Sequence, residues 1–229
     1  MNSIVNTLLI WSEVWALIIP LCFVFPLKKP FLRPVFYYLV IAFILNAVAN
    51  IISNQKTIGI NLPWHSNTIL YNIHSIARFV CFSYFFIRLR QNHYRSIKRI
   101  IPFIYILLVF LNFTLFDSLF NSNHISGNLL TAESYLLLIY CLLYYLSKLK
   151  DEVPLSSGPD FWIVIGLSIY VVINFFVFLF YVPMIKENPV LANNIWSIHN
   201  VGYILLCLFI AKGFYSQKDE PGLNMPPVR

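Results

Sequence analysis

Long runs of hydrophobic residues alternate with short polar breaks along the whole chain. A helix that crosses the hydrocarbon core of a bilayer, about 30 Å thick, needs about 20 apolar residues. The breaks contain proline, asparagine and charged residues, which are typical of turns. The pattern therefore predicts an all-α, polytopic membrane protein that forms a single domain over residues 1–229. We expect one transmembrane helix in each of seven runs: 4–25, 34–53, 67–88, 100–120, 129–147, 160–181 and 193–213.

The composition agrees with a lipid environment. Of the 229 residues, 59% are hydrophobic and 11% are charged, whereas a soluble domain has about 25% charged residues. The first hydrophobic run lacks a basic leader and contains Glu13, so we interpret it as a retained helix and not as a signal peptide. The polar breaks are too short for a soluble domain. A catalytic or signalling module in the cytoplasm is therefore expected to belong to a partner protein.

The basic residues indicate the orientation. Short cytoplasmic loops of membrane proteins are enriched in Lys and Arg. The seven predicted spans place only Lys56 and Lys186 on one side, and Arg78 falls inside a span. The remaining Lys and Arg residues fall on the other side: Lys28, Lys29, Arg33, Arg88, Arg90, Arg95, Lys98, Arg99, Lys148, Lys150, Lys212, Lys218 and Arg229. This predicts an N-terminus outside and a C-terminus in the cytoplasm, in a bacterial inner membrane. The net charge of +7 is thus accounted for without nucleic acid.

The two halves of the chain share a set of landmarks. Glu13 precedes Lys28 by the same interval at which Glu133 precedes Lys148. An Ile-His pair ends at His74 in the first half and at His199 in the second. Asn50 and Asn174 lie at similar positions in the second helix of each half. Because the first three and last three predicted helices have the same orientation, we expect a parallel 3+1+3 internal repeat, over residues 1–99 and 125–218.

The chain resembles two groups of membrane proteins. At the level of topology, the chain resembles SWEET and PQ-loop transporters and seven-helix opsins, although it contains no Pro-Gln pair and no lysine in the middle of the last span. Local patterns resemble small seven-helix membrane proteins of Bacteroidota-type bacteria, a resemblance that implies no particular activity. These patterns are Tyr71-Asn72, Phe161-Trp162-Ile163, Asn174 and Ile195-Trp196-Ser197-Ile198-His199.

Polar residues of the predicted spans share one depth. Ionisable residues are costly in hydrocarbon and are functional candidates for that reason. At 1.5 Å per residue, six polar residues from six predicted helices lie about 20–25 Å from the cytoplasmic boundary, in the outer third of the membrane. They are Glu13, Asn50, His74, Glu133, Asn174 and His199. We predict a polar layer and a ligand site at this level. The candidate residues are Glu13, Asn50, Tyr71, His74, Arg78, Glu133, Asn174, Trp196, His199 and Asn200.

Several of these residues also have a structural interpretation. Buried Asn side chains often join helices through hydrogen bonds, and Tyr71 and Trp196 are compatible with interfacial anchors. Glu133 is close enough to a helix start to be an interfacial carboxylate of the first turn. Arg78 needs a partner, and we predict an interaction with Glu13 or Glu133.

The sequence leaves three functions open. The first is a sensor that binds a small polar or anionic ligand in an outward-facing pocket and acts through a cytoplasmic signalling partner. The second is a transporter of small solutes or one coupled to protons. The third is a membrane-embedded metal-dependent hydrolase, with His74, His199, Glu13 and Glu133 as metal ligands. No cofactor is predicted, and the missing mid-span lysine argues against retinal.

Overall fold

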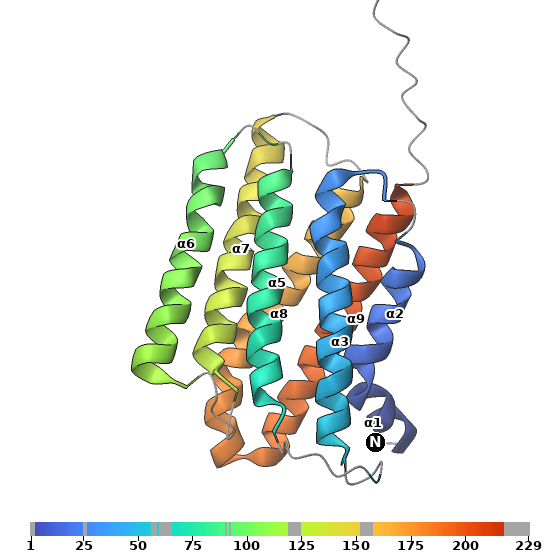
Figure 1. Cartoon of the computed structure of the whole chain (residues 1–229), viewed down its shortest axis with the longest axis vertical. Coiled ribbons are helices and arrows are strands. Elements are labelled where there is room, and N and C mark those ends of the chain that lie inside the picture. The colour runs from blue at the N-terminus through green and yellow to red at the C-terminus, as the bar shows by residue number, and fades with distance from the viewer. Residues whose placement is uncertain are drawn as a thin grey trace, which may run out of the picture.

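The computed structural model describes residues 3–24, 27–55, 59, 66–89, 91, 93–118, 125–151 and 158–217. Every regular element within these residues is a helix, as the hydrophobic pattern predicts. The long helices run roughly along one axis (Figure 1). They are α3 (Arg33–Ser53), α5 (Thr68–Arg88), α6 (Arg95–Leu111), α7 (Gly127–Lys150), α8 (Pro159–Glu187) and α9 (Pro189–Ser216). Short 3₁₀ and π segments, Pro30–Leu32 and Asn112–Phe116, extend α3 and α6.

These six helices are long and apolar enough to cross a membrane. The chain is therefore a multi-pass membrane protein by length and composition. The first predicted span, 4–25, differs from the expectation because it contains two helices, α1 (Ser3–Ile10) and α2 (Ser12–Cys22). They are separated at Trp11, and neither is long enough to span a membrane alone.

Side chains stabilise the break between α1 and α2. The carbonyl of Leu9 accepts hydrogen bonds from Ser12 Oγ at 2.7 Å and from Asn200 Nδ2 at 3.1 Å. The carbonyl of Leu8 accepts one from Trp15 Nε1 at 2.9 Å. An interrupted helix in lipid needs such partners for its freed backbone groups. Asn200, a predicted ligand residue, is thus engaged with the backbone of the first segment.

The break expected between the predicted spans 160–181 and 193–213 is shortened to one residue. Helix α8 continues through Pro183 to Glu187, and only Asn188 separates it from α9. Asn188 Oδ1 caps α9 by accepting a hydrogen bond from the Leu191 N–H at 3.0 Å, and Pro189 occupies the first position of α9. Pro189 costs no hydrogen bond because it stands at the start of α9. Pro183 lies inside α8, four residues before the end of that helix, and does not end it.

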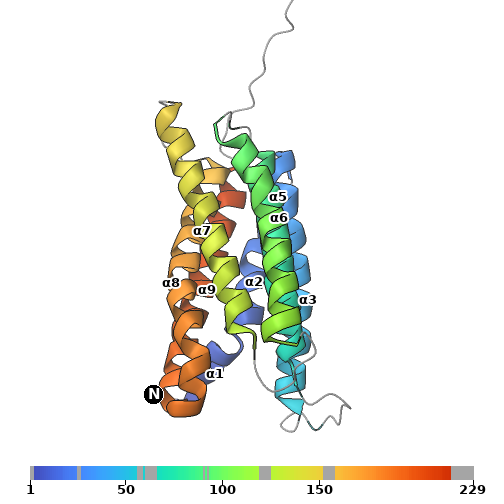
Figure 2. The ribbon, with the colours of Figure 1, turned by 90° about the vertical axis from the view of Figure 1, so that its left-hand side faces the viewer.

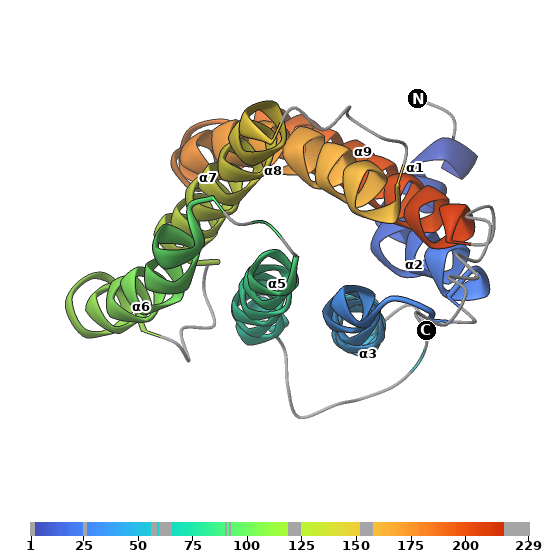
Figure 3. The ribbon, with the colours of Figure 1, turned by 90° about the horizontal axis from the view of Figure 1, so that it is seen from above.

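The helices form a closed ring. Going round it, α2 packs on α3, α3 on α5, α5 on α7, α7 on α8, α8 on α9, and α9 on α2. Helix α6 packs outside the ring against α5 and α7, as the view down the axis shows (Figure 3). From the side, α7, α8 and α9 lie opposite α3, α5 and α6 (Figure 2). The interior of the ring holds large, fully buried aromatic side chains, among them Tyr38, Phe82, Tyr140, Tyr170 and Tyr203.

One end of the bundle is basic. The ends of α5, α7 and α9 and the beginnings of α3 and α6 meet there, at the top of Figure 1. The Lys and Arg residues of this basic end include Arg33, Arg88, Arg95, Lys148, Lys150 and Lys212. Helix α1 lies at the opposite end, which we call the far end. The fold therefore gathers these basic residues at one end, as the predicted orientation requires. Arg90, Lys56, Lys218 and Arg229 lie outside the described residues.

Candidate functional site

One face of α5 carries most of the polar chemistry in the ring. Tyr71, Ser75 and Arg78 follow one another at intervals of three or four residues, with His74 beside them, so all four lie on the same side of the helix. Three of them, His74, Ser75 and Arg78, are buried. This face points into the ring and contacts residues of α2, α7 and α8.

Arg78 forms a two-point ion pair with Glu133 of α7. Its Nε donates to Oε1 at 2.5 Å and its Nη2 to Oε2 at 2.7 Å, a geometry that is typical of strong Arg–carboxylate pairs. The predicted interaction between Arg78 and a carboxylate is confirmed. Ser75 Oγ donates to Glu133 Oε2 at 2.5 Å. The third nitrogen, Nη1, donates to Tyr170 OH at 2.5 Å, and the guanidinium carbon lies 5.0 Å from the centre of the Tyr170 ring.

Glu133 is therefore an interior residue. It is the seventh residue of α7, beyond the first turn, and its exposed fraction is 0%. The interpretation of Glu133 as an interfacial first-turn carboxylate is wrong. The helix begins at Gly127, earlier than expected, because Ser126 caps it by accepting from the Leu129 N–H.

Glu13 belongs to a second cluster, nearer the far end. Its Oε2 accepts a hydrogen bond from Tyr71 OH at 3.2 Å, and its Oε1 lies 3.4 Å from His199 Nε2. Both carboxylate and imidazole are buried. The other ring nitrogen, His199 Nδ1, contacts Asn174 Oδ1. Helices α2, α5, α8 and α9 thus meet at this cluster.

The hydrogen bonds of Asn174 fix the tautomer of His199. Asn174 Nδ2 donates to the Tyr170 carbonyl at 2.7 Å, so the atom facing His199 is the acceptor Oδ1. His199 Nδ1 must therefore carry a hydrogen. Nε2 then faces Glu13 either as an acceptor or, in the imidazolium, as a donor.

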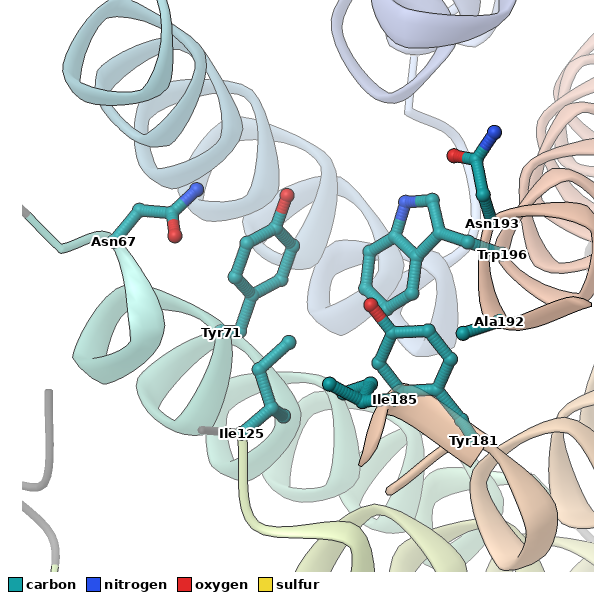
Figure 4. Close-up of a pocket in the computed structure, with 8 residues that line it drawn as sticks. All are labelled: Asn67, Tyr71, Ile125, Tyr181, Ile185, Ala192, Asn193 and Trp196. Carbon is teal, nitrogen blue, oxygen red and sulfur yellow. The ribbon is translucent and has the colours of Figure 1, made fainter. Parts of the chain in front are cut away.

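A pocket of about 370 Å³ lies at the far end, between α5, α8 and α9. Tyr71 forms one side, and Tyr181 and Trp196 form the other (Figure 4). The amides of Asn67 and Asn193 stand at its margin, and Ile125, Ile185 and Ala192 complete the lining. No charged side chain lines this pocket among the described residues. It is an aromatic pocket with amide groups at the edge.

The floor of the pocket contacts the Glu13–His199 pair directly. Tyr71 binds Glu13 through its hydroxyl. The Trp196 ring lies 4.9 Å from the ring of His199 and 5.6 Å from that of Tyr71, measured between centroids. Tyr181 packs on the other side of Trp196 at 5.0 Å. Tyr71 and Trp196 thus lie between the pocket and the buried side chains of Glu13 and His199.

The remaining predicted site residues lie elsewhere in the ring. His74 stacks on Tyr38 at 5.8 Å and packs against Tyr203 at 6.3 Å. Its Nε2 is buried and has no hydrogen-bond partner among the described residues. Asn50 Nδ2 donates to the carbonyl of Asn46 in its own helix, at 3.1 Å. The predicted layer therefore separates into the Glu13 cluster, the Arg78–Glu133 pair and a buried histidine.

Sequence reasoning missed several members of these clusters. Ser75 and Tyr170 are uncharged, but their helical spacing from Arg78 and Asn174 places them on the same faces. Asn46 donates to the backbone carbonyl of Glu13 at 3.0 Å. The pocket residues Asn67, Tyr181 and Asn193 lie near helix ends, where polar and aromatic residues are common, so the sequence offered no signal for them.

The predicted metal ligands do not form one group. Glu133 is bound by Arg78, whereas Glu13 faces His199, so the two carboxylates belong to different clusters. Among the described residues, no group of three or more His, Cys, Asp or Glu side chains could hold a metal ion.

Comparisons with known proteins add no relative: no protein-family model matches the chain, and neither the curated proteins nor the solved structures give a match. The resemblance to seven-helix proteins of Bacteroidota-type bacteria stays a prediction. The function is therefore inferred from the geometry of the site alone.

Proposed function

We propose that the chain is a membrane receptor or sensor that binds a small polar ligand in the pocket at the far end. One observation carries this proposal: Tyr71 and Trp196 line the pocket and also contact the Glu13–His199 pair. A ligand that displaces either aromatic ring would change the surroundings of a buried carboxylate and imidazole. Binding at the surface would thereby alter contacts inside the ring.

We further propose that the far end faces the outside and the basic end the cytoplasm. The positive-inside rule supports this orientation. In this arrangement α1 and α2 together form a seventh, bent span, since residues 3–22 would extend about 30 Å as helix. The hydrogen bonds around Leu8 and Leu9 make such a bend tolerable in lipid.

The lining favours a ligand with a protonated amine and an apolar part. The electron-rich faces of Tyr71, Tyr181 and Trp196 attract cations, and Glu13 is the nearest buried carboxylate to them. An anionic ligand at Arg78 is less favoured, because Glu133 already matches the charge of Arg78 at two points. Asn67 Nδ2 already donates to Ser53 Oγ, so Asn67 Oδ1 and the amide of Asn193 are the groups that can orient the ligand by hydrogen bonds.

A cytoplasmic partner would carry the signal. Below the pocket, contacts continue from His199 to Asn174, then to Tyr170 and Arg78, and from Arg78 to Glu133 on α7. Helix α7 ends at the basic end, where Lys148 and Lys150 occupy its last turn. We propose that a cytoplasmic partner detects a movement of α7 at the basic end.

Binding of matched small molecules tests this function. Purified protein in neutral detergent is titrated with phenethylamine, tetramethylammonium and 3-phenylpropionate, with thermal stability and tryptophan fluorescence as readouts. The two cations are expected to stabilise the protein, and the carboxylate is not. Glu13→Gln should weaken cation binding by about tenfold, whereas Asp117→Asn, at the same end but outside this pocket, should not. Equal binding of the cations and the carboxylate, or no effect of Glu13→Gln, contradicts the proposal.

A proton-coupled transporter is the second candidate. Glu13 Oε1 lies 3.4 Å from His199 Nε2 close to the far-end pocket, and buried carboxylate and histidine side chains relay protons in transporters. The proposed 3+1+3 repeat is compatible with this candidate, since α2, α3 and α5 follow one another around the ring and so do α7, α8 and α9.

Uptake separates the two candidates. In proteoliposomes, a transporter accumulates a labelled amine and a pH gradient drives it, whereas a receptor binds the amine without uptake. The buried rings of Tyr38, Tyr170 and Tyr203 pack across the ring below His199. Transport would require these rings to move, so we place the receptor first. The metal-dependent hydrolase comes third, because the described residues offer it no ligand set.

A further inference from the structure

Two atoms with lone pairs face each other where Glu13 meets His199. Glu13 Oε1 is buried and has no hydrogen-bond partner among the described residues, although it lies 3.4 Å from His199 Nε2. Asn174 Oδ1 fixes the hydrogen of the neutral imidazole on Nδ1. Nε2 of the neutral ring therefore points a lone pair at the carboxylate. Two such acceptors repel each other unless a positive charge lies at the contact.

The neutral donors around the carboxylate reach other atoms. Tyr71 OH donates to Glu13 Oε2, not to Oε1, at 3.2 Å. Asn46 Nδ2 donates to the backbone carbonyl of Glu13 at 3.0 Å. The buried cation of the ring, Arg78, is bound at two points by Glu133. Among the contacts that the structure describes, none of these groups therefore supplies the positive charge that Oε1 and Nε2 need.

Other titratable groups surround the pair. Tyrosine hydroxyls stay neutral near neutral pH, and the charge of Arg78 is matched by Glu133. His74 is different, because it packs against the same Tyr203 ring as His199, with both centroid distances at 6.3 Å. Helix α1 contributes no titratable side chain. The groups that face the pair from the other helices are Tyr38 on α3, Tyr71, His74 and Arg78 on α5, Glu133 on α7, Tyr170 and Tyr181 on α8, and Tyr203 on α9.

The far-end pocket lies one side chain away from the pair. Tyr71 lines the pocket with its ring and binds Glu13 with its hydroxyl, and the Trp196 ring lies 4.9 Å from that of His199 (Figure 4). Charges interact more strongly in such an interior than in water. A cation in the pocket and a proton at the pair would both neutralise Glu13, so each weakens the binding of the other.

We propose that a cationic ligand entering the far-end pocket displaces a proton from the Glu13–His199 pair. Without ligand, the pair holds one proton, on the Glu13 carboxyl or on His199 Nε2, and is neutral. When the ligand binds, this proton passes to water and the carboxylate balances the ligand charge, so the net charge of the site is unchanged. The ligand therefore binds more tightly as the pH rises. This inference rests on the proposed function, because it needs a cation in that pocket.

Calorimetry with tetramethylammonium tests the exchange, because this ion is charged at every pH and has no proton to lose. The full chain in neutral detergent is titrated from about pH 5 to about pH 9, at each pH in two buffers with different ionisation enthalpies. The difference in heat between the two buffers gives the number of protons released. We expect about one proton per bound ion at low pH and a fall toward zero at high pH. The affinity should rise by up to about tenfold per pH unit in the low range.

Two variants locate the proton. Glu13→Gln removes the carboxylate and should abolish both the proton release and the pH dependence of the residual binding. Asn174→Ala frees the tautomer, so neutral His199 can direct its own hydrogen from Nε2 to Glu13 and the pair needs no extra proton. Proton release in Asn174→Ala should fall about twofold or more. The controls Asn50→Ala and His74→Gln should keep the full release.

The outcomes separate this inference from the proposed function. Binding of tetramethylammonium without proton release at any pH would overturn the exchange and leave the receptor proposal in place. No binding at any pH would overturn both. Undiminished release in Glu13→Gln, or a loss in His74→Gln that Asn174→Ala does not share, would assign the proton to another group and overturn the exchange at this pair.

Discussion

Glu13 and Glu133 lie on opposite sides of the ring, and the same face of α5 binds both of them. Tyr71 donates to Glu13, and two turns further along Arg78 binds Glu133. The carboxylates belong to α2 and α7, which do not neighbour one another in the ring. A rotation of α5 about its axis would therefore disturb both clusters together, and α5 is the element through which a change at the far-end pocket could reach the centre of the bundle.

The Arg78–Glu133 pair is expected to be essential for stability. Removing one member of a buried ion pair leaves an uncompensated charge and costs about 3–5 kcal/mol. Arg78→Gln and Glu133→Gln should each lower the thermal unfolding temperature in detergent strongly, and the double variant should be less destabilised than the sum of the two. Arg33→Gln, at an exposed position, is the control. Strictly additive losses would show that the two residues do not interact in the membrane.

The Tyr71 hydroxyl should contribute to stability and to binding. Tyr71→Phe removes the donor to Glu13 Oε2 and keeps the aromatic wall of the pocket. We expect a destabilisation of about 1 kcal/mol, the usual size for a hydrogen bond between membrane helices. Tyr37→Phe is the matched control, because the side chain of Tyr37 is 54% exposed. A change at Tyr71 no larger than that at Tyr37 would contradict the contact with Glu13.

The tautomer of His199 is a direct test of the site geometry. In protein labelled with ¹⁵N-histidine, the His199 side chain should carry a hydrogen on Nδ1, with the signal assigned by its loss in His199→Gln. Asn174→Ala removes the acceptor of Nδ1 and should abolish this preference. Asn50→Ala, the counterpart of Asn174 in the other half, should leave it unchanged. Persistence of the Nδ1 tautomer in Asn174→Ala would show that another group fixes it.

The sequence predicted the helices better than their contacts. Apolar runs and the distribution of Lys and Arg can be identified by counting residues along the chain. They predicted the long helices and the basic end correctly. Depth placed Glu13 and His199 at one level, and they do lie 3.4 Å apart. The depth of a residue alone does not indicate which carboxylate, Glu13 or Glu133, faces Arg78. That choice depends on how each helix is rotated about its axis, which the packing of the whole ring decides.

The break at Trp11 and the one-residue turn at Asn188 both depend on side chains that bind freed backbone groups. Local residues suggest where a helix can end, but the partners of the freed backbone groups decide whether it does. At the first site, Ser12, Trp15 and Asn200 supply donors to the carbonyls of Leu8 and Leu9. Asn200 is far away in sequence, so its contribution could not be read from the local pattern.

Close packing of α8 and α9 should depend on two glycines. A Cβ at Gly166 would collide with the Cβ of Phe209, and one at Gly213 would lie 2.8 Å from Ile163 Cγ1 and 3.0 Å from the carbonyl oxygen of Pro159. Small residues let membrane helices approach closely. Gly166→Ala and Gly213→Ala should therefore lower the unfolding temperature. At Gly202 the nearest atom is 3.5 Å away, an ordinary contact, so Gly202→Ala is the control and should be tolerated. Equal losses at all three positions would contradict the packing argument, since helix propensity alone favours Ala over Gly and predicts a slight stabilisation.

The orientation can be tested with single cysteines. The four native cysteines, Cys22, Cys81, Cys141 and Cys207, form no disulfide and can be replaced by alanine or serine. In this background, Asn193→Cys at the far end and Lys150→Cys at the basic end both lie on exposed positions. A membrane-impermeant maleimide should label Asn193→Cys on intact cells and Lys150→Cys only after permeabilisation. The opposite pattern would place the aromatic pocket in the cytoplasm and the excess positive charge outside. Because external amines could then no longer reach Tyr71 and Trp196 directly, that result would overturn the receptor proposal as well as the orientation.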